Sequence, residues 1–165
     1  VDMPGTPFFA VNAHLTAFAI DDTKQKHISG FKNILDDIVS SGYSFVAGGD
    51  LNAIPPNATK TNFCFEDQCS PGDYDPNDDK KGGCDFTEEI TWLNDLYRNY
   101  EPAITLDQYR MNELKHYTHS PGGKLDLDRK LDYLWTNTSW SNGQTHQAAT
   151  PLSDHIPITA NWIVE

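Results

Sequence analysis

Two polar side chains end an apolar segment of the chain and are separated by a single residue. The segment reads Ser-Phe-Val-Ala-Gly-Gly-Asp-Leu-Asn, so that Asp50 and Asn52 follow two glycines. Residues two apart on a β-strand lie on the same face, which would point both polar side chains one way and Leu51 the other. The glycines free the backbone to bend and leave room for another group to approach. The pattern indicates a strand that delivers a carboxylate and an amide to a site; an ordinary Asx turn is the alternative.

Other apolar segments also begin or end with side chains that can exchange protons or bind cations. His14 ends one such segment, Asp132 lies within Arg-Lys-Leu-Asp-Tyr-Leu, and Asp154 and His155 directly precede the last apolar segment. Each of them alone could be a turn or surface residue. Imidazoles and carboxylates are, however, the side chains that transfer protons and hold metal ions. Their recurrence at segment ends favours one shared site.

The elements that would position these residues alternate along the chain. Residues 7–15 and 43–47 resemble strands, and between them apolar residues recur at three- and four-residue steps, which predicts a helix that ends at Gly42. A strand–helix–strand unit predicts two adjacent parallel strands with the helix over one face. The helix would bury Ile28, Phe31, Ile34, Leu35 and Ile38. We further expect a helix over 86–97, an irregular segment over 109–123, and strands over 130–136, 145–149 and 156–164.

A long loop is expected at about residues 55–85, which are rich in Pro, Asn, Asp, Gly and Cys. Its acidic residues between 73 and 79 alternate as in a calcium loop, but the expected Gly and Glu are missing, so a solvated acidic loop is the default. The three cysteines, Cys64, Cys69 and Cys84, favour a disulfide over a zinc site, with one cysteine left over. Cysteines in a loop favour a secreted or periplasmic protein.

Length, composition and charge limit the classes of protein. With 165 residues, of which 38% are hydrophobic, the chain can bury a core and is one domain or part of one. A formal charge of −12 disfavours binding to nucleic acid unless cations or a local basic patch intervene. No apolar run approaches the roughly 18 residues needed to cross a bilayer, so no transmembrane segment is expected.

The order of four short motifs resembles the endonuclease/exonuclease/phosphatase superfamily. The motifs are Asn-Ala-His-Leu at 12–15, Gly-Asp-Leu-Asn at 49–52, Lys-Leu-Asp-Tyr at 130–133 and Ser-Asp-His at 153–155. The resemblance spans residues 9–164 and implies an α/β protein with a DNase I-like fold. Residues 1–165 would be the C-terminal portion of a single domain, half of a four-layer α/β/β/α sandwich with a mixed, largely antiparallel sheet. It also implies hydrolysis of phosphate esters with Mg²⁺ or Mn²⁺.

The resemblance implies a role for each motif residue, because phosphate ester hydrolysis needs an activated water, stabilisation of phosphoryl charge and a proton for the leaving oxygen. Asp50 would orient or deprotonate the water, and Asn52 would donate a hydrogen bond to a phosphoryl oxygen. Asp154, together with Asp50 and Asn52, would hold the metal ion as a hard oxygen ligand.

The histidines complete the set that the resemblance implies. His155 would face the phosphate, while Asp132 would accept its other ring proton and favour the charged imidazole. His14 would be the general acid, which points to the DNase I and sphingomyelinase side of the family. Substrate-binding candidates are Asn12, Tyr117, His119 and Arg129; His27, His116 and His146 are expected to be structural or surface residues.

One departure from the family concerns the principal metal ligand. In the family the first half of the fold supplies an Asn and a Glu that binds the metal, and no Glu of this sequence has the motif around it. We therefore expect the chain alone to bind metal poorly and to be inactive. Half of a sandwich would also expose an apolar sheet face, so we expect a partner chain or segment that carries the N-terminal half.

The sequence leaves the substrate open between phosphodiesters and phosphomonoesters. A DNase I-like endonuclease is one alternative, although the absence of a Lys/Arg cluster disfavours long nucleic acid. An alternative of another class is a non-catalytic binding or structural domain with the same fold.

Overall fold

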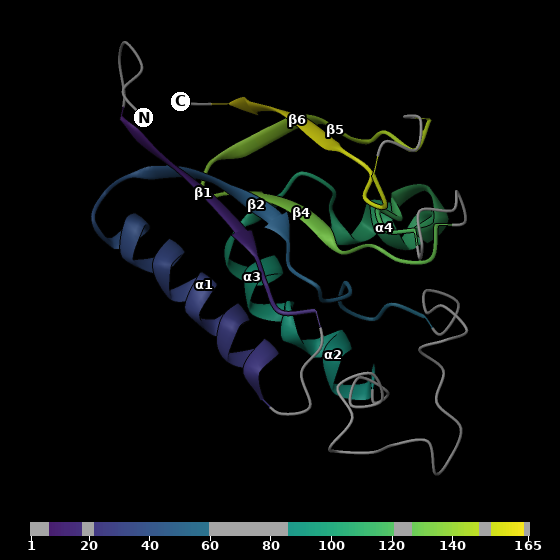
Figure 1. Ribbon diagram of the computed structural model, residues 1–165. Coiled ribbons are helices and arrows are strands. Elements are labelled where there is room, and N and C mark those ends of the chain that lie inside the picture. Colours follow the sequence, from purple (N-terminus) through teal and green to yellow (C-terminus); the bar gives the residue numbers. More distant parts are fainter. Residues whose placement is uncertain (1–6, 18–21, 60–85, 121–126, 149–152, 164–165) are drawn as a thin grey trace.

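A mixed four-stranded sheet forms the centre of the computed structural model (Figure 1). The structure describes residues 7–17, 22–59, 86–120, 127–148 and 153–163. The strand order is β1-β2-β4-β3, with β1 and β2 parallel and the other two pairs antiparallel. The strands are β1 (Phe8–His14), β2 (Ser44–Asp50), β3 (Glu101–Pro102) and β4 (Asp132–Thr136). A separate antiparallel pair is formed by β5 (Ser139–Thr145) and β6 (Ile158–Ile163).

The predicted strand–helix–strand unit is confirmed as β1, α1 (Thr23–Ser40) and β2. The helix buries Ile28, Phe31, Leu35 and Ile38. Ile34 was predicted to be buried with them and is 52% exposed, because it lies one residue off this stripe and about 100° around the helix from Leu35. Gly42 follows the helix with a φ of 80°, a left-handed conformation that suits glycine.

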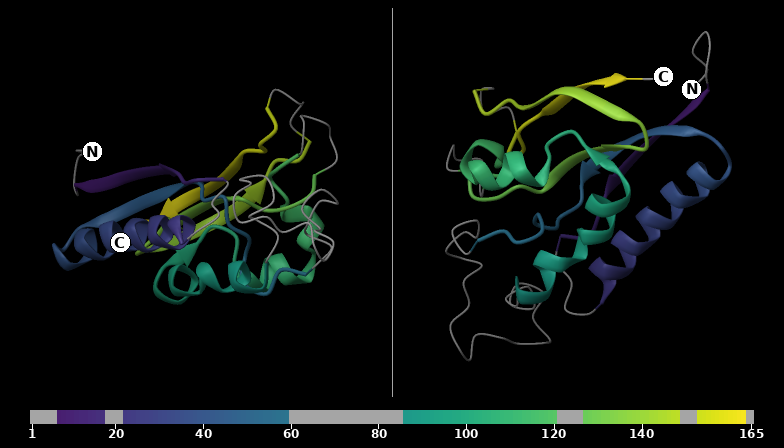
Figure 2. Two further views of the ribbon diagram at one scale, coloured as in Figure 1. Left: turned by 60° about the horizontal axis from the view of Figure 1, so that its bottom comes forward. Right: turned by 180° about the vertical axis from the view of Figure 1, so that it is seen from behind.

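Three layers follow one another across the molecule. Helices α1 and α3 (Asn94–Asn99) lie on one side of the four-stranded sheet, and the β5–β6 pair lies on the other (Figures 1 and 2). Between the helices and the sheet is the main core, which includes Phe45, Leu96 and Trp135. On the opposite side, the ring of Trp162 in β6 packs at a tilt against that of Phe8, with centroids 4.6 Å apart, and Trp162 donates a hydrogen bond to Thr136. The small sheet therefore covers part of the second face of the large one.

The helical segments after residue 85 differ from the prediction. In place of one helix over 86–97, α2 (Phe86–Trp92) and α3 are separated at Leu93, which is fully buried in the main core. The segment predicted as irregular over 109–123 contains the second half of α4 (Leu106–Met111) and the 3₁₀ helix η3 (Glu113–His116). The start of α4 has a capping box between Thr105 and Gln108, a signal that the sequence does contain.

The strand predicted over 145–149 is wrong; the strand of this region is β5, which ends at Thr145. Asn-Gly pairs are common in hairpin turns, but Asn142 and Gly143 form an irregularity within β5, and Asn142 has a φ of 54°. A Cβ atom at Gly143 would collide with the carbonyl oxygen of Ala103, so β5 passes close to the residue that follows β3.

A second, smaller core cluster supports the end of the sheet where the polar motifs lie. Its members are Ile54, Ala58, Ile104, Tyr109, Tyr117 and Leu131. Most of the predicted loop over 55–85, with its three cysteines and its acidic residues, lies outside the described residues. None of the helices in the described ranges combines the length and hydropathy of a membrane span.

Candidate active site

The end of β2 forms a tight turn around the carboxylate of Asp50. The backbone N–H of Asn52 donates to Asp50 Oδ1 at 2.8 Å, and its side-chain nitrogen donates to Asp50 Oδ2 at 3.1 Å and to the Leu15 carbonyl at 2.8 Å. Asn52 has a φ of 47°, a conformation that Asn adopts more readily than most residues. The Asx turn and the polar site are thus not alternatives, because the turn fixes the Asp50 carboxylate while Oδ2 still faces two histidines.

His155 and Asp132 form a hydrogen-bonded pair beside Asp50. Sheet pairing sets Asp132 directly opposite Asp50. His155 Nδ1 lies 2.8 Å from Asp132 Oδ2, and its Nε2 lies 3.6 Å from Asp50 Oδ2. The carboxylate of Asp132 therefore holds the Nδ1 proton, which leaves Nε2 facing Asp50.

His14 reaches the same carboxylate from the neighbouring strand. It pairs with Asp50 in the parallel register of β1 and β2, and its Nε2 lies 3.5 Å from Asp50 Oδ2. Its side chain is 76% exposed, whereas that of Asp50 is only 13% exposed. The Asp50 carboxylate therefore lies between the exposed imidazole of His14 and the more buried imidazole of His155.

Burial and neighbouring charges shift the protonation equilibria of this group. Burial raises the pKa of Asp50 above its ordinary value. The hydrogen bond from the Asn52 backbone lowers this pKa, and the nearby Asp132 carboxylate raises it further. The hydrogen bond to Asp132 raises the pKa of His155, although burial opposes it. A carboxylate made more basic and an imidazole whose charged form is favoured are suited to proton transfer near neutral pH.

A second carboxylate–imidazole pair lies next to the first. His119 Nδ1 is 2.8 Å from Asp128 Oδ1, and Arg129 donates two hydrogen bonds to Asp128 Oδ2, at 2.8 and 2.6 Å. The rings of His119 and His155 meet edge to face with centroids 5.2 Å apart. His119 and Arg129 were predicted from the sequence as substrate-binding residues, but Asp128 was not, because nothing in Leu-Asp-Leu-Asp-Arg distinguishes it from a solvated acidic residue.

The predicted metal ligands fall into two neighbouring groups that share His155. Asp50, Asp132 and His155 form one, and His119, Asp154 and His155 form the other; in each, one ligand atom per residue lies within 4.8 Å of the rest. Asp154 is exposed and lies near His155, but it is not in the group that contains Asp50. Asn52 is the remaining predicted ligand, and its side-chain nitrogen donates hydrogen bonds to the Leu15 carbonyl and to Asp50 Oδ2.

The other substrate-binding candidates occupy different surroundings. Asn12 lines a groove of about 600 Å³ between the second face of the sheet and residues 153–158, together with Asp132 and His155. Tyr117 is 2% exposed and belongs to the second core cluster, so it would have to leave that core to touch a substrate. The groove therefore connects Asp132 and His155, two of the predicted catalytic residues, with Asn12 but not with Tyr117.

Lys130 differs most from its expected setting. In the sequence it appeared with Arg129 as a basic pair at a solvated strand edge or facing a phosphate, yet it is 1% exposed. Its ammonium group donates to the Asp132 carbonyl at 2.6 Å and lies 4.6 Å from the centre of the Tyr133 ring. Burial lowers the pKa of Lys130 to about 7. Its ammonium group therefore contacts the backbone of β4 and does not face the groove.

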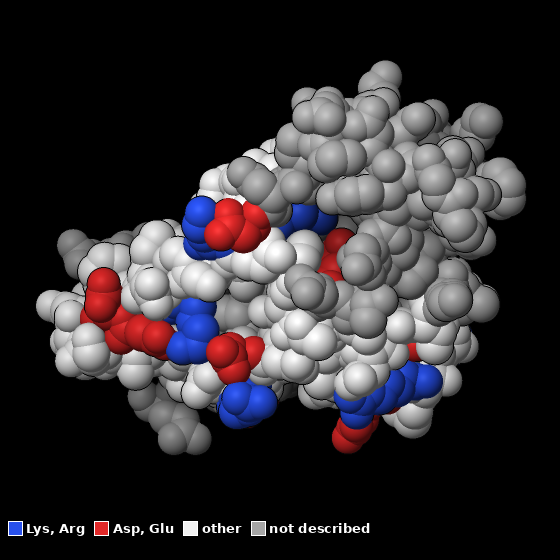
Figure 3. All heavy atoms as spheres, turned by 90° about the horizontal axis from the view of Figure 1, so that it is seen from below, with Lys and Arg blue, Asp and Glu red and all other residues white. Residues whose placement is uncertain are grey.

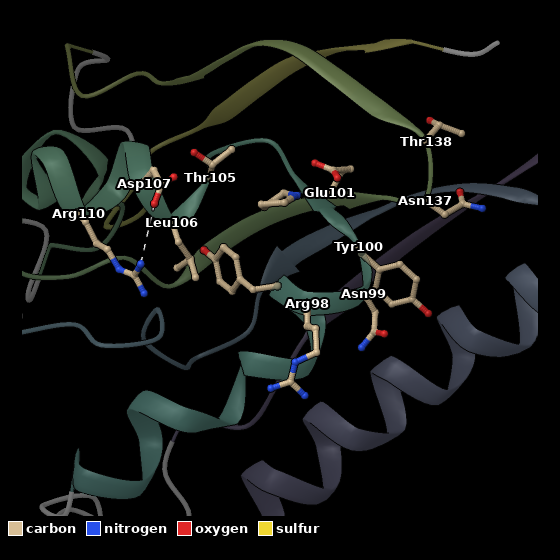
Figure 4. Close-up of a pocket in the computed structure, with 12 residues that line it drawn as sticks. Arg98, Asn99, Tyr100, Glu101, Thr105, Leu106, Asp107, Arg110, Asn137 and Thr138 are labelled. Carbon is tan, nitrogen blue, oxygen red and sulfur yellow. Dashed lines mark ion pairs between the residues drawn. The ribbon is translucent and has the colours of Figure 1, made fainter.

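A further hollow of about 450 Å³ lies beside α3, β3 and α4 (Figure 4). Arg98, Glu101, Asp107 and Arg110 are among its lining residues, and Arg110 pairs loosely with Asp107 at 3.9 Å. None of the residues predicted for the site lines it. The chemistry of the described residues is thus concentrated at the groove between β1, β2, β4 and residues 153–158.

Charged side chains on the face viewed in Figure 3 are mixed in sign, with acidic groups next to basic ones. Ion pairs such as Lys26 with Asp22 and Lys32 with Asp36 occur along α1 and just before it. Among the described residues of the face in Figure 3, there is no concentrated basic patch of the kind that binds nucleic acid. The sequence matches no model of a known protein family and has no significant match among curated proteins.

Proposed function

We propose that this chain provides the Asp, Asn and His residues of a divalent-metal-dependent phosphoric ester hydrolase, of the kind that the superfamily resemblance implies. The observation that supports this best is the convergence of His14, Asp50, Asp132 and His155, from three strands and the segment before β6, around one carboxylate oxygen. A turn or a stable core needs no such convergence of titratable groups, and the raised pKa values of Asp50 and His155 are typical of functional sites.

Each residue has a chemical task in this proposal. Asp50, whose pKa is raised by burial, accepts a proton from the attacking water. His155 donates from Nε2 to a phosphoryl oxygen, since Asp132 holds its Nδ1 proton and favours the charged ring. His14 is exposed enough to meet a leaving group and donates the proton that the departing oxygen requires.

The proposed cofactor is Mg²⁺ or Mn²⁺. A divalent cation supplies charge stabilisation to the phosphoryl oxygens and makes a bound water more acidic. Asp50 and Asp154 offer the hard carboxylate oxygens that such ions prefer, on either side of His155. Two carboxylates in separate groups are a sparse set for Mg²⁺, which agrees with the proposal that a further ligand comes from outside this chain.

We also propose that the layers of this structure are part of a four-layer α/β/β/α sandwich. The layers of helices, four-stranded sheet and two-stranded sheet are consistent with three layers of an α/β/β/α sandwich, with β5–β6 in the second sheet. We propose that a chain or segment with the N-terminal half extends that second sheet and covers the groove. In support, Ala10 and Asn12 of β1 line the groove, and together with His14 they alternate along the strand and are all exposed.

The test is hydrolysis of bis(p-nitrophenyl) phosphate with Mg²⁺ or Mn²⁺ by the full-length protein. We expect Asp50→Ala and His155→Ala to abolish turnover, while His27→Ala, which removes an exposed histidine of α1, leaves it unchanged. The 165-residue chain alone should be inactive. If wild type and variants are equally inactive with all metals and with plasmid DNA, sphingomyelin and inositol phosphates, the result would favour a non-catalytic binding domain. Robust activity of the 165-residue chain alone would refute the proposal that a metal ligand comes from outside this chain.

A further inference from the structure

The second imidazole, His119, is fixed in place by backbone pairing on both sides. Residue 119 bridges to Arg129 on one side and to His155 on the other, both antiparallel. The Ser120 N–H donates to the Asp154 carbonyl at 2.8 Å, and the Asp128 N–H donates to the His119 carbonyl at 3.0 Å. Residues directly opposite each other in antiparallel pairing present their side chains on the same face. The adjacency of the two histidine rings is therefore set by the backbone.

Each of the two imidazoles also has its Nδ1 held by a carboxylate outside the pair. Asp132 lies 2.8 Å from His155 Nδ1, and Asp128 lies 2.8 Å from His119 Nδ1. Arg129 in turn fixes Asp128 through two hydrogen bonds. Histidines that bind metal ions almost always donate the second ring proton to a carboxylate, carbonyl or water in this way, which orients the ring and increases its basicity. Both rings thus have the support that metal-binding histidines require.

We propose that, when no phosphate ester occupies the site, His119, Asp154 and His155 bind a Zn²⁺ ion, through Nε2 of each histidine and a carboxylate oxygen of Asp154. Imidazole nitrogens favour Zn²⁺ over Mg²⁺, and two histidines with one carboxylate leave a fourth position for water or another ligand. One ligand atom from each residue already lies within 4.8 Å of the others. Tetrahedral ligands at Zn–N distances near 2.0 Å are about 3.3 Å apart, so the ligand atoms must move closer together, and the side chain of Asp154 is exposed to solvent.

The neighbouring group of Asp50, Asp132 and His155 is a poorer match for Zn²⁺. His155 is its only imidazole, and Asp132 is already engaged with Nδ1 of that ring. Asp50 accepts two hydrogen bonds from Asn52 and offers a carboxylate, the ligand type that favours Mg²⁺ over Zn²⁺. The two groups share His155, so the substitutions that separate them must be made at residues that belong to one group alone, such as His119, Asp154 or Asp50.

The binding test uses ¹H–¹⁵N correlation spectra of the histidine rings while Zn²⁺ is added to the 165-residue chain without substrate. We expect saturable shifts of the Nε2 signals of His119 and His155, and no change at His27, an exposed histidine of α1 that belongs to neither group of candidate ligands. Because the signals are those of ring nitrogens, Zn²⁺ bound by the three cysteines does not imitate this result. The outcome does not depend on whether the chain hydrolyses a phosphate ester.

Variants then assign the ligands. His119→Ala and Asp154→Asn should abolish the shift of His155, Asp128→Asn should weaken binding about 10- to 100-fold, and Asp50→Asn should leave it within about twofold of wild type. Asp154 is exposed, so its substitution tests the site even if His119→Ala does not fold. Loss of binding in Asp50→Asn with retention in His119→Ala would overturn the proposal in favour of the neighbouring group. Absence of any saturable shift at His119 would also overturn it.

Discussion

Lys130 should make the stability of this protein depend on pH in a window where few other groups act. Its side chain is buried, and burial lowers the pKa of the ammonium group from 10.5 to about 7, with the Asp132 charge opposing the shift. His116 lies near enough to be affected by the charge of Lys130, and burial lowers its pKa too. Because the folded chain binds the lysine proton more weakly than the unfolded chain, the free energy of unfolding should rise with pH between about 7 and 10.5.

The size of the effect follows from the shift. Each pKa unit corresponds to about 1.4 kcal/mol, so the full shift is equivalent to an upper limit of about 5 kcal/mol. Below pH 7 both states are protonated and the whole penalty for burying the charge is present. Lys130→Met removes that penalty and also the hydrogen bond to the Asp132 carbonyl, which contributes about 1 kcal/mol. We therefore expect Lys130→Met to stabilise the protein at pH 7 by about 2–4 kcal/mol.

The assay is urea unfolding of both proteins at several pH values between 6 and 10.5. The difference in unfolding free energy between Lys130→Met and wild type should be largest at the acidic end and should fall as pH rises, until the variant loses its advantage. Lys115→Met, which removes an exposed lysine of η3, should show no such trend. A difference that does not change with pH, or a variant less stable than wild type at pH 7, would refute the reasoning that Lys130 is buried and readily deprotonated.

Three further changes test the site and the fold. Asp132→Asn should move the pKa of His155 downward, because the hydrogen bond to Asp132 raises it, and a pH titration of the ring by NMR measures this; an unchanged pKa contradicts the pairing. Gly143→Ala should destabilise the protein by about 1–3 kcal/mol, since its Cβ would meet the Ala103 carbonyl, and thermal unfolding shows whether it does. Thr105→Ala should cost about 1 kcal/mol through loss of the helix cap; a variant as stable as wild type in urea would show that the cap contributes nothing.

Local patterns were read correctly where each element depends on its own sequence. The three- and four-residue spacing of Ile28, Phe31 and Leu35 predicts α1, and the apolar segments on either side predict β1 and β2 in parallel. The positions of Asp50 and His155 at strand ends were equally visible, and the structure brings them to within 3.6 Å of each other. In these cases chain-local hydrophobic patterns and the short connections of an α/β unit determine the arrangement.

Features that depend on distant contacts were not visible in the sequence. Asp128 acquires its place beside His119 only because the backbone on either side of that histidine pairs with two other segments. The burial of Lys130 likewise depends on a carbonyl and a ring that cover it, and nothing in its immediate sequence indicates either. In β5, Asn142 and Gly143 gave the signal of a turn, while pairing with β6 extends the strand through them.

The antiparallel placement of β4 beside β2 has a consequence for the order in which the molecule folds. β1, α1 and β2 form contacts along one continuous stretch, whereas β4 joins β2 through contacts such as that between Thr136 and the Phe45 carbonyl, 91 residues apart. Pairing over such a separation requires closure of a long loop and is slow relative to local structure. We therefore expect Asp132 to meet Asp50 late in folding. The geometry around His155 forms only after these distant segments of the chain have come together.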